Sequence, residues 1–220
     1  MGVMEAAHPY MPVSMELPGF HPALMSQAFI LATYGGASAV VVLIVWLLSG
    51  SVAKLRTVDR LLMCWFAFSG LTHIILEGYF VFTPDFFTFT KPHLLAEVWK
   101  EYSKADSRYV GRDPTVVVIE GITAVLAGPG CLLAVYAIAT KPVYEHTLQL
   151  VVSTAQLYGD IVYFATVILK GVEICLPGPV YYWFYYIFMN GIWVVIPLLI
   201  SFRSWGAINR AFASTKKKSA

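Results

Sequence analysis

Five stretches of the chain are long and apolar enough to cross a lipid bilayer, and more polar segments separate them. A spanning helix needs about 20 mainly apolar residues. Helices are the default in lipid because the backbone must satisfy its own hydrogen bonds there. The pattern therefore predicts an all-α membrane protein, a bundle of five transmembrane helices, with spans at about residues 28–50, 61–83, 115–139, 147–169 and 180–202.

Composition supports this class and excludes others. Of the 220 residues, 58% are hydrophobic and only 13% are charged, against about 25% charged in soluble domains. The net charge is +2, and no basic stripe alternates with aromatic residues, so nucleic acid is not an expected partner. We predict one transmembrane domain (28–204) between an N-terminal tail (1–27) and a basic C-terminal tail (205–220). The three cysteines show neither metal-ligand spacing nor a disulfide framework.

The distribution of Lys and Arg predicts the orientation. The tail 1–27 has no Lys or Arg and no signal-peptide pattern, so the first span is expected to direct insertion. The short first loop and the C-terminal region are basic, which favours a luminal N-terminus and a cytosolic C-terminus. The loop 84–114 also carries five Lys or Arg, but five acidic residues balance them.

The chain ends in Lys217, Lys218, Ser219 and Ala220. Lysines at these positions of a cytosolic end resemble the dilysine retrieval signal of endoplasmic reticulum membrane proteins, which coat retrieval machinery reads as an address. This predicts a multi-pass protein of the endoplasmic reticulum membrane. The alternative is a solvated basic tail.

Ionisable residues inside the predicted spans are the strongest sign of function. A charged group in hydrocarbon costs about 2.5–3.5 kcal/mol even on the mildest insertion scale. Such residues persist where they face a protein interior. The chain has four of them: His73, Glu77, Glu120 and Asp160.

These residues fall at similar depths. At about 1.5 Å of rise per residue, His73 lies near the middle of its span and Glu77 about 7 Å nearer the lumen. Glu120 lies about 10 Å and Asp160 about 3 Å to the luminal side of centre, and Asn190 is central. His73 and Glu77 share a helix face because they are four residues apart. The sequence therefore predicts a buried polar pocket between the helices.

Further polar positions extend this pocket. Thr123 follows Glu120 by three residues, Trp193 follows Asn190 by three, and Gln156 precedes Asp160 by four. Trp193 is too deep for an interfacial aromatic belt, and its ring face can receive a cation. The role of Asp160 stays open. With one intramembrane histidine, neither a bis-histidine haem nor a catalytic metal is expected.

The loop 84–114 contains an amphipathic stretch from Leu94 to Tyr102, which is expected to lie on the membrane surface. Arg108 and Tyr109 are expected at the luminal mouth of the pocket. The alternative is a solvated linker.

Four segments of the chain carry the intramembrane charges and their surroundings: LLMCWFAFSGLTHIILEGYFVF, WKEYSKADSRYVGRDPTVVVIEGITA, LQLVVSTAQLYGDIVYF and WFYYIFMNGIW. They resemble the emopamil-binding protein family, the sterol Δ8–Δ7 isomerases of the EXPERA superfamily. The resemblance runs from about His8 to Trp205 and includes the intramembrane charges.

The resemblance implies an enzyme without metal, nucleotide or redox cofactor, which takes a sterol from the bilayer and moves its ring double bond from position 8 to position 7. The family's functional positions match this chain. Its H-x-x-x-E element falls on His73 and Glu77, E-x-x-T on Glu120 and Thr123, N-x-x-W on Asn190 and Trp193, and the tyrosine of DSRY on Tyr109.

For this reaction we assign the residues as follows. His73 and Glu77 donate a proton to carbon 9, and a carbocation forms at carbon 8. Glu120, oriented by Thr123, opposes the cation or accepts the carbon 7 proton. Trp193 faces the cation, and Asn190 holds the polar network. Lipophilic amines should inhibit, because an ammonium imitates the carbocation. How Glu77 and Glu120 divide the roles stays open.

Two other functions remain. One is a non-catalytic protein of the same superfamily that binds sterols or cationic amphiphiles, as sigma-2-type relatives do. The other is a proton-coupled transporter, because buried acids and histidines also form proton relays. Five spans without inverted repeats disfavour a transporter. The exact sterol and the number of chains stay open, with a homodimer as one arrangement.

Overall fold

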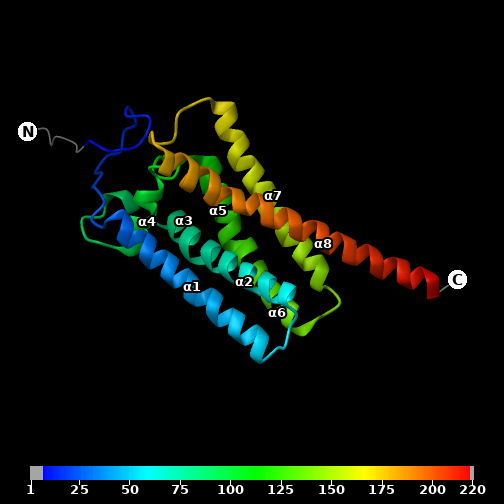
Figure 1. Cartoon of the computed structure of the whole chain (residues 1–220). Coiled ribbons are helices and arrows are strands. Elements are labelled where there is room, and N and C mark those ends of the chain that lie inside the picture. The colour runs from blue at the N-terminus through cyan, green and yellow to red at the C-terminus, as the bar shows by residue number, and fades with distance from the viewer. Residues whose placement is uncertain (1–6, 219–220) are drawn as a thin grey trace, which may run out of the picture.

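Five long helical rods form a bundle in the computed structural model of the chain (Figure 1). The structure describes residues 7–218, with side chains described as far as residue 215. All five rods are long and apolar enough to span a membrane, which confirms the predicted fold class. They cover Gln27–Ser51, Thr57–Phe82, Pro114–Thr140, Glu145–Lys170 and Val180–Thr215.

Each rod consists of one or more helical segments. The first is α1 (Gln27–Ser51), and the second joins α2 (Thr57–Leu71), the π-helical η1 (Thr72–Glu77) and α3 (Gly78–Phe82). A short 3₁₀ turn, η2 (Phe86–Thr88), and α4 (Leu94–Tyr102) follow outside the rods. The remaining rods comprise α5 (Pro114–Ile122), π-helical η3 (Thr123–Ala127), α6 (Gly128–Thr140), α7 (Glu145–Lys170), π-helical η4 (Val180–Phe188) and α8 (Met189–Lys218).

The helix ends follow from local sequence. The Ser26 hydroxyl caps α1 by accepting the Phe29 N–H, and Asp113 caps α5 directly before Pro114 at the first helical position. At their C-terminal ends, α6 and α7 stop at residues in the left-handed conformation, Lys141 (φ 55°) and Gly171 (φ 60°). Left-handed residues at this position end many helices.

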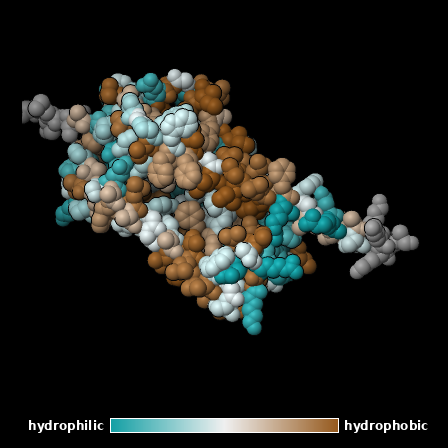
Figure 2. All heavy atoms as spheres, viewed as in Figure 1, coloured by the Kyte–Doolittle hydropathy of each residue, from teal (hydrophilic) through white to brown (hydrophobic). Residues whose placement is uncertain are grey.

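The outer faces of the rods are apolar. In α1 only Ile30 and Ser49 are buried within the protein, and most of its Val, Leu and Ile side chains are exposed. Figure 2 shows hydrophobic residues over the middle of the visible face and hydrophilic residues gathered toward its two ends. A hydrophobic middle with polar ends is the surface expected of a protein in a bilayer.

Two glycines bring the second and third rods close together beside His73. A Cβ on Gly70 would lie 3.0 Å from the carbonyl oxygen of Gly128. A Cβ on Gly128 would lie 2.6 Å from Ile74 and 3.2 Å from the Cβ of His73. Small residues at a helix interface let two backbones approach in this way.

Residues 84–113, which we call the cap, fold over one end of the bundle. The expectation that Leu94–Tyr102 lies on the membrane surface is wrong, as is the solvated-linker alternative. The helix α4 buries its charged side chains inside the protein: Glu97 and Lys100 are fully buried and paired at 3.1 Å. The pairing satisfies both charges, so the amphipathic pattern reflects internal packing rather than contact with lipid.

The N-terminal segment is packed against the cap. The Tyr10 hydroxyl donates a hydrogen bond to the Lys100 carbonyl at 3.1 Å, and the backbone N–H groups of Leu24 and Met25 donate to Glu97. At the other terminus, α8 continues to Lys218, well beyond the predicted span, and projects past the other rods (Figure 1). The side chains of Lys217 and Lys218, and residues 219–220, lie outside the described part, so the retrieval signal stays a prediction.

Candidate functional site

A cavity with about 1030 Å³ of space, part of it open to the surroundings, lies between the rods, beneath the cap. All five rods and the cap contribute to its wall, which is mainly apolar with a few polar groups. This composition is typical of sites for small apolar ligands. The cavity brings together all the predicted site residues: His73, Glu77, Tyr109, Glu120, Thr123, Asn190 and Trp193.

His73 and Glu77 form a hydrogen-bonded pair on the wall of the cavity. The imidazole Nδ1 lies 2.7 Å from each oxygen of the Glu77 carboxyl group. Both residues belong to the π-helical segment η1 and are buried. The Thr123 hydroxyl, from η3 on the neighbouring rod, donates a further hydrogen bond to Glu77. Glu77 is thus surrounded by donors.

Glu120 is held by the cap rather than by Thr123. The Tyr109 hydroxyl donates to the Glu120 carboxyl group at 2.5 Å. Thr123 reaches only the backbone carbonyl of Glu120, at 2.9 Å, so the expectation that it orients the Glu120 side chain needs correction. Burial, and then the charge of Glu120, raise the pKa of Tyr109 well above its usual value. Tyr109 therefore keeps its proton and acts as a donor.

A second chain of contacts runs from the far side of His73 to Trp193. The Gln156 amide nitrogen lies 2.9 Å from the His73 Nε2 and 3.0 Å from the Ser69 hydroxyl. The same hydroxyl accepts the Trp193 indole N–H at 3.1 Å. The Trp193 ring is 6.3 Å from the His73 ring between centroids. Three rods thus fix the imidazole on both sides.

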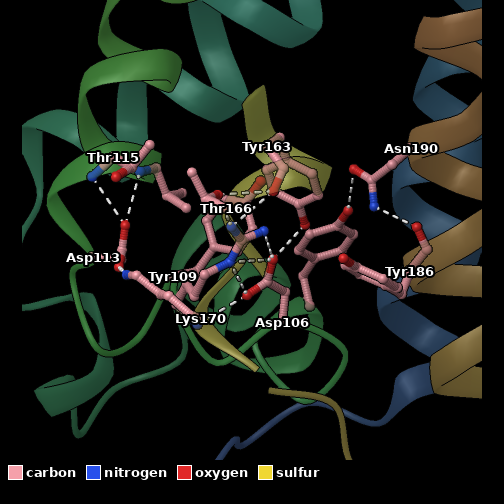
Figure 3. Close-up of polar contacts among 12 residues, drawn as sticks. Asp106, Tyr109, Asp113, Thr115, Tyr163, Thr166, Lys170, Tyr186 and Asn190 are labelled. Carbon is pink, nitrogen blue, oxygen red and sulfur yellow. Dashed lines mark hydrogen bonds and ion pairs between the residues drawn. The ribbon is translucent and has the colours of Figure 1, made fainter. Parts of the chain in front are cut away.

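Asn190 connects the fifth rod to the cap. Its side-chain oxygen accepts the Tyr102 hydroxyl at 3.0 Å, and its amide nitrogen donates to the Tyr186 carbonyl at 2.7 Å (Figure 3). Tyr102 also lines the cavity. The predicted role of Asn190 as a holder of the polar network thereby has a specific partner.

Arg108 anchors the cap to α7 instead of lining the cavity. It forms an ion pair with Asp106 at 2.6 Å and donates to the Tyr163 carbonyl and the Thr166 hydroxyl (Figure 3). Burial alone would lower the pKa of Arg108, but Asp106 raises it overall. The Tyr163 hydroxyl donates to Asp106 at 2.5 Å. Only Tyr109 of the predicted pair lies at the pocket.

Asp160 also lines the cavity, and its Oδ2 atom has no hydrogen-bond partner among the described residues. Two residues with clear contacts received no role from the sequence: Ser69 and Tyr102. Gln156 was predicted only as a polar position of the pocket, and the structure adds its contact with His73. The four-residue spacing from Ser69 to His73 was a usable signal for Ser69. Nothing in the sequence pointed to Tyr102.

The fold and the cavity define a multi-pass helical membrane protein that encloses acidic groups and an imidazole. Residues 94–204 match the family model EXPERA (EXPanded EBP superfamily). An Arabidopsis thaliana protein named as a probable 3-beta-hydroxysteroid-Delta(8),Delta(7)-isomerase is 54% identical over 222 residues, covering 97% of this chain and 98% of the relative. An Oryza sativa protein with the same name is 54% identical over 96% of each chain. The chain belongs to the emopamil-binding protein family.

The Rattus norvegicus protein named 3-beta-hydroxysteroid-Delta(8),Delta(7)-isomerase is 41% identical over 89% of this chain and 86% of its own length. These relatives confirm the family inferred from the sequence motifs. The chain is an isomerase and a membrane protein. Among the described residues, no group of His, Cys, Asp or Glu is arranged to hold a metal ion.

Proposed function

We propose that this protein is a sterol Δ8–Δ7 isomerase, which moves a ring double bond of a 3β-hydroxysterol. The observation that carries the proposal is the joint placement of His73, Glu77 and Glu120 on one cavity of a membrane bundle. Relatives that cover nearly the whole chain carry the name of this activity. An apolar cavity between lipid-facing helices suits a substrate that is almost entirely hydrocarbon.

The first step of the proposed reaction adds a proton to carbon 9 of the alkene and leaves a carbocation at carbon 8. An alkene is a weak base, so the proton donor must be strong and water must be excluded. The buried His73–Glu77 pair is our candidate for the proton donor, because its two groups already lie in hydrogen-bond contact at 2.7 Å. Donors already in position need no reorganisation during the reaction.

The second step removes a proton from carbon 7, and the new double bond forms between carbons 7 and 8. One proton enters and one leaves, so the product is an isomer and no oxidant or reductant is needed. Glu120 opposes the cation or accepts this proton. Trp193 offers its π face to the cation. Tyr109 holds Glu120, and Asn190 with Tyr102 fixes the cap over the cavity.

We also propose that the protein resides in the endoplasmic reticulum membrane, with the cap luminal and the C-terminus cytosolic. The basic residues Lys54, Arg56 and Arg60 lie at the end of the bundle opposite the cap, and Arg203 and Arg210 follow on α8. A cytosolic location of this end agrees with the positive-inside bias.

Expression in cells that lack sterol Δ8–Δ7 isomerase tests the function. The chain should restore Δ7 sterols in the sterol profile, and Glu77→Gln or Glu120→Gln should leave Δ8 sterols accumulated at equal protein levels. Accumulation of Δ8 sterols with the unchanged chain would refute the proposal. It would favour a non-catalytic binder of sterols or cationic amphiphiles.

The family also contains relatives with other names, and product analysis separates them. A Melia azedarach protein named isomeliandiol synthase is 44% identical over 84% of this chain. An Ailanthus altissima protein named protoglabretal synthase is 44% identical over 96%. The higher identity of 54% to the proteins named as isomerases favours the Δ8–Δ7 shift.

A further inference from the structure

Two polar groups at the cap end of the cavity take no part in the proposed chemistry. Tyr185 lines the cavity and is only 3% exposed, yet its hydroxyl makes no hydrogen bond of normal geometry among the described residues, although the Gln27 amide lies near it. A buried hydroxyl without a partner costs about 1–3 kcal/mol. An unsatisfied donor in a ligand cavity therefore points to a group on the ligand.

Glu101 is the second group, from α4 of the cap. It is 2% exposed and also lines the cavity. Its Oε1 atom accepts from Gln27 at 2.8 Å and from Tyr181 at 3.2 Å, and its Oε2 atom accepts from Lys104 at 2.6 Å. An ionised carboxylate offers about four acceptor positions, so one position on Oε2 remains open.

These groups lie at a useful distance from the reacting centre. Tyr185 precedes Trp193 by eight residues on the same rod, at most about 12 Å of helical rise toward the cap. Ile30, Leu31 and Met189 add apolar side chains to the cavity wall. A sterol likewise carries its hydroxyl on ring A at one end and the shifting double bond in ring B, with hydrocarbon between.

We propose that Tyr185 and Glu101 bind the 3β-hydroxyl group of the substrate. The Tyr185 O–H donates to the sterol oxygen, and the sterol O–H donates to Glu101. Both unfilled positions on the protein are then satisfied. This inference rests on the proposed function and adds the polar contact that fixes which end of the sterol faces the cap.

The test compares two substrates in membranes that contain the full chain: a Δ8 3β-hydroxysterol and the same sterol without its 3-hydroxyl group. Conversion to the Δ7 product is measured for the unchanged protein, for Tyr185→Phe, and for the control Tyr182→Phe, whose side chain is exposed and does not line the cavity. The quantity of interest is the ratio of kcat/KM for the two substrates. A partly unfolded sample lowers both values equally and leaves this ratio unchanged.

The unchanged protein should prefer the hydroxysterol, and Tyr185→Phe should lower the ratio about tenfold, as expected for one lost hydrogen bond of about 1.4 kcal/mol. Tyr182→Phe should leave the ratio as it is. A ratio that stays the same in Tyr185→Phe overturns the hydroxyl site while leaving the isomerase intact. Failure of the unchanged protein to isomerise either sterol overturns the proposed function instead.

Discussion

At the scale of single residues, the orientation of the Gln156 amide indicates which nitrogen of His73 carries the proton. Its nitrogen faces the His73 Nε2, so that ring nitrogen accepts and the ring proton lies on Nδ1 toward Glu77. The amide oxygen has no partner among the described residues. Turning the amide over would offer this oxygen to a proton on Nε2. Gln156 can therefore support the imidazole before and after it gains a second proton.

Replacing Gln156 with Leu should lower kcat about 10²-fold, because a loosened imidazole loses its alignment with the substrate. The pH dependence of kcat should shift as well, which a purely structural defect would not cause. Sterol isomerisation in membranes measures both. Tyr158→Phe is the matched control, since Tyr158 lies on the same helix and is exposed. An unchanged pH profile with Gln156→Leu would contradict this role.

The contact between Tyr109 and Glu120 gives a second prediction. Tyr109→Phe removes the hydroxyl that donates to Glu120 at 2.5 Å, and we expect kcat to fall about 10–10²-fold with a smaller change in KM, as when one donor to a reacting group is lost. The double variant Tyr109→Phe, Glu120→Gln should be little worse than Glu120→Gln alone, because the two residues act as one unit. Additive losses would show that Tyr109 acts elsewhere.

Most of the site residues could be predicted from the sequence because charged residues are rare inside membrane spans. His73, Glu77 and Glu120 converge as their depths predicted. The sequence could not show which donor forms a hydrogen bond with which acceptor. Thr123 and Glu120 share a helix face, yet the Thr123 hydroxyl turns to Glu77 on another rod. Such a choice depends on how two rods are rotated about their axes, which the order of residues does not specify.

At the scale of elements, π-helical segments coincide with the site. His73 and Glu77 lie in η1, Thr123 opens η3, and Asn190 follows η4 by two residues. Single π turns inside longer helices often occur at functional sites. The apolar pattern showed only uninterrupted helices, because one extra residue in a turn barely alters the composition of a span.

Gly128 should tolerate no side chain of ordinary size. Gly128→Val would push against Ile74, and against His73 in η1, and we expect a loss of about 1–3 kcal/mol in stability together with most of the activity. Thermal unfolding in detergent and sterol conversion measure the two effects. Gly36→Ala on α1, where a Cβ would meet nothing within 4 Å, is the control. Equal behaviour of both variants would show that the rods have room to separate.

The cap should depend on its buried ion pair. Lys100→Met leaves Glu97 with two backbone donors but without its charged partner, and breaking a buried pair costs about 3–5 kcal/mol. We expect a clearly lower unfolding temperature than for Lys91→Met, a change at an exposed position of the same loop. Similar temperatures for the two variants would contradict this account. The burial was not predictable, because an amphipathic helix looks the same on a membrane as inside a cap.

At the scale of the whole molecule, the bundle was predictable because lipid permits few alternatives. Segments such as 28–50 and 147–169 must be helical in a bilayer, and the structure extends each by only one or two residues at either end. The fold of the cap and the packing of the N-terminal segment could not be predicted from the sequence. Their folding depends on contacts such as Tyr10 with Lys100, between residues 90 positions apart.

The molecule as a whole surrounds acidic groups with apolar side chains in its cavity. We therefore expect the cavity to bind cationic lipophiles preferentially. An amine of sterol-like size would place its ammonium beside Glu77, Glu120 and the Trp193 ring, where the proposed carbocation forms. We expect competitive inhibition, with the amine binding at least about 10²-fold more tightly than a neutral analogue that has carbon in place of nitrogen. Inhibition constants against a Δ8 sterol measure this ratio. Equal inhibition by the two compounds would mean that the cavity recognises only apolar shape. The buried acids would then have no part in stabilising positive charge.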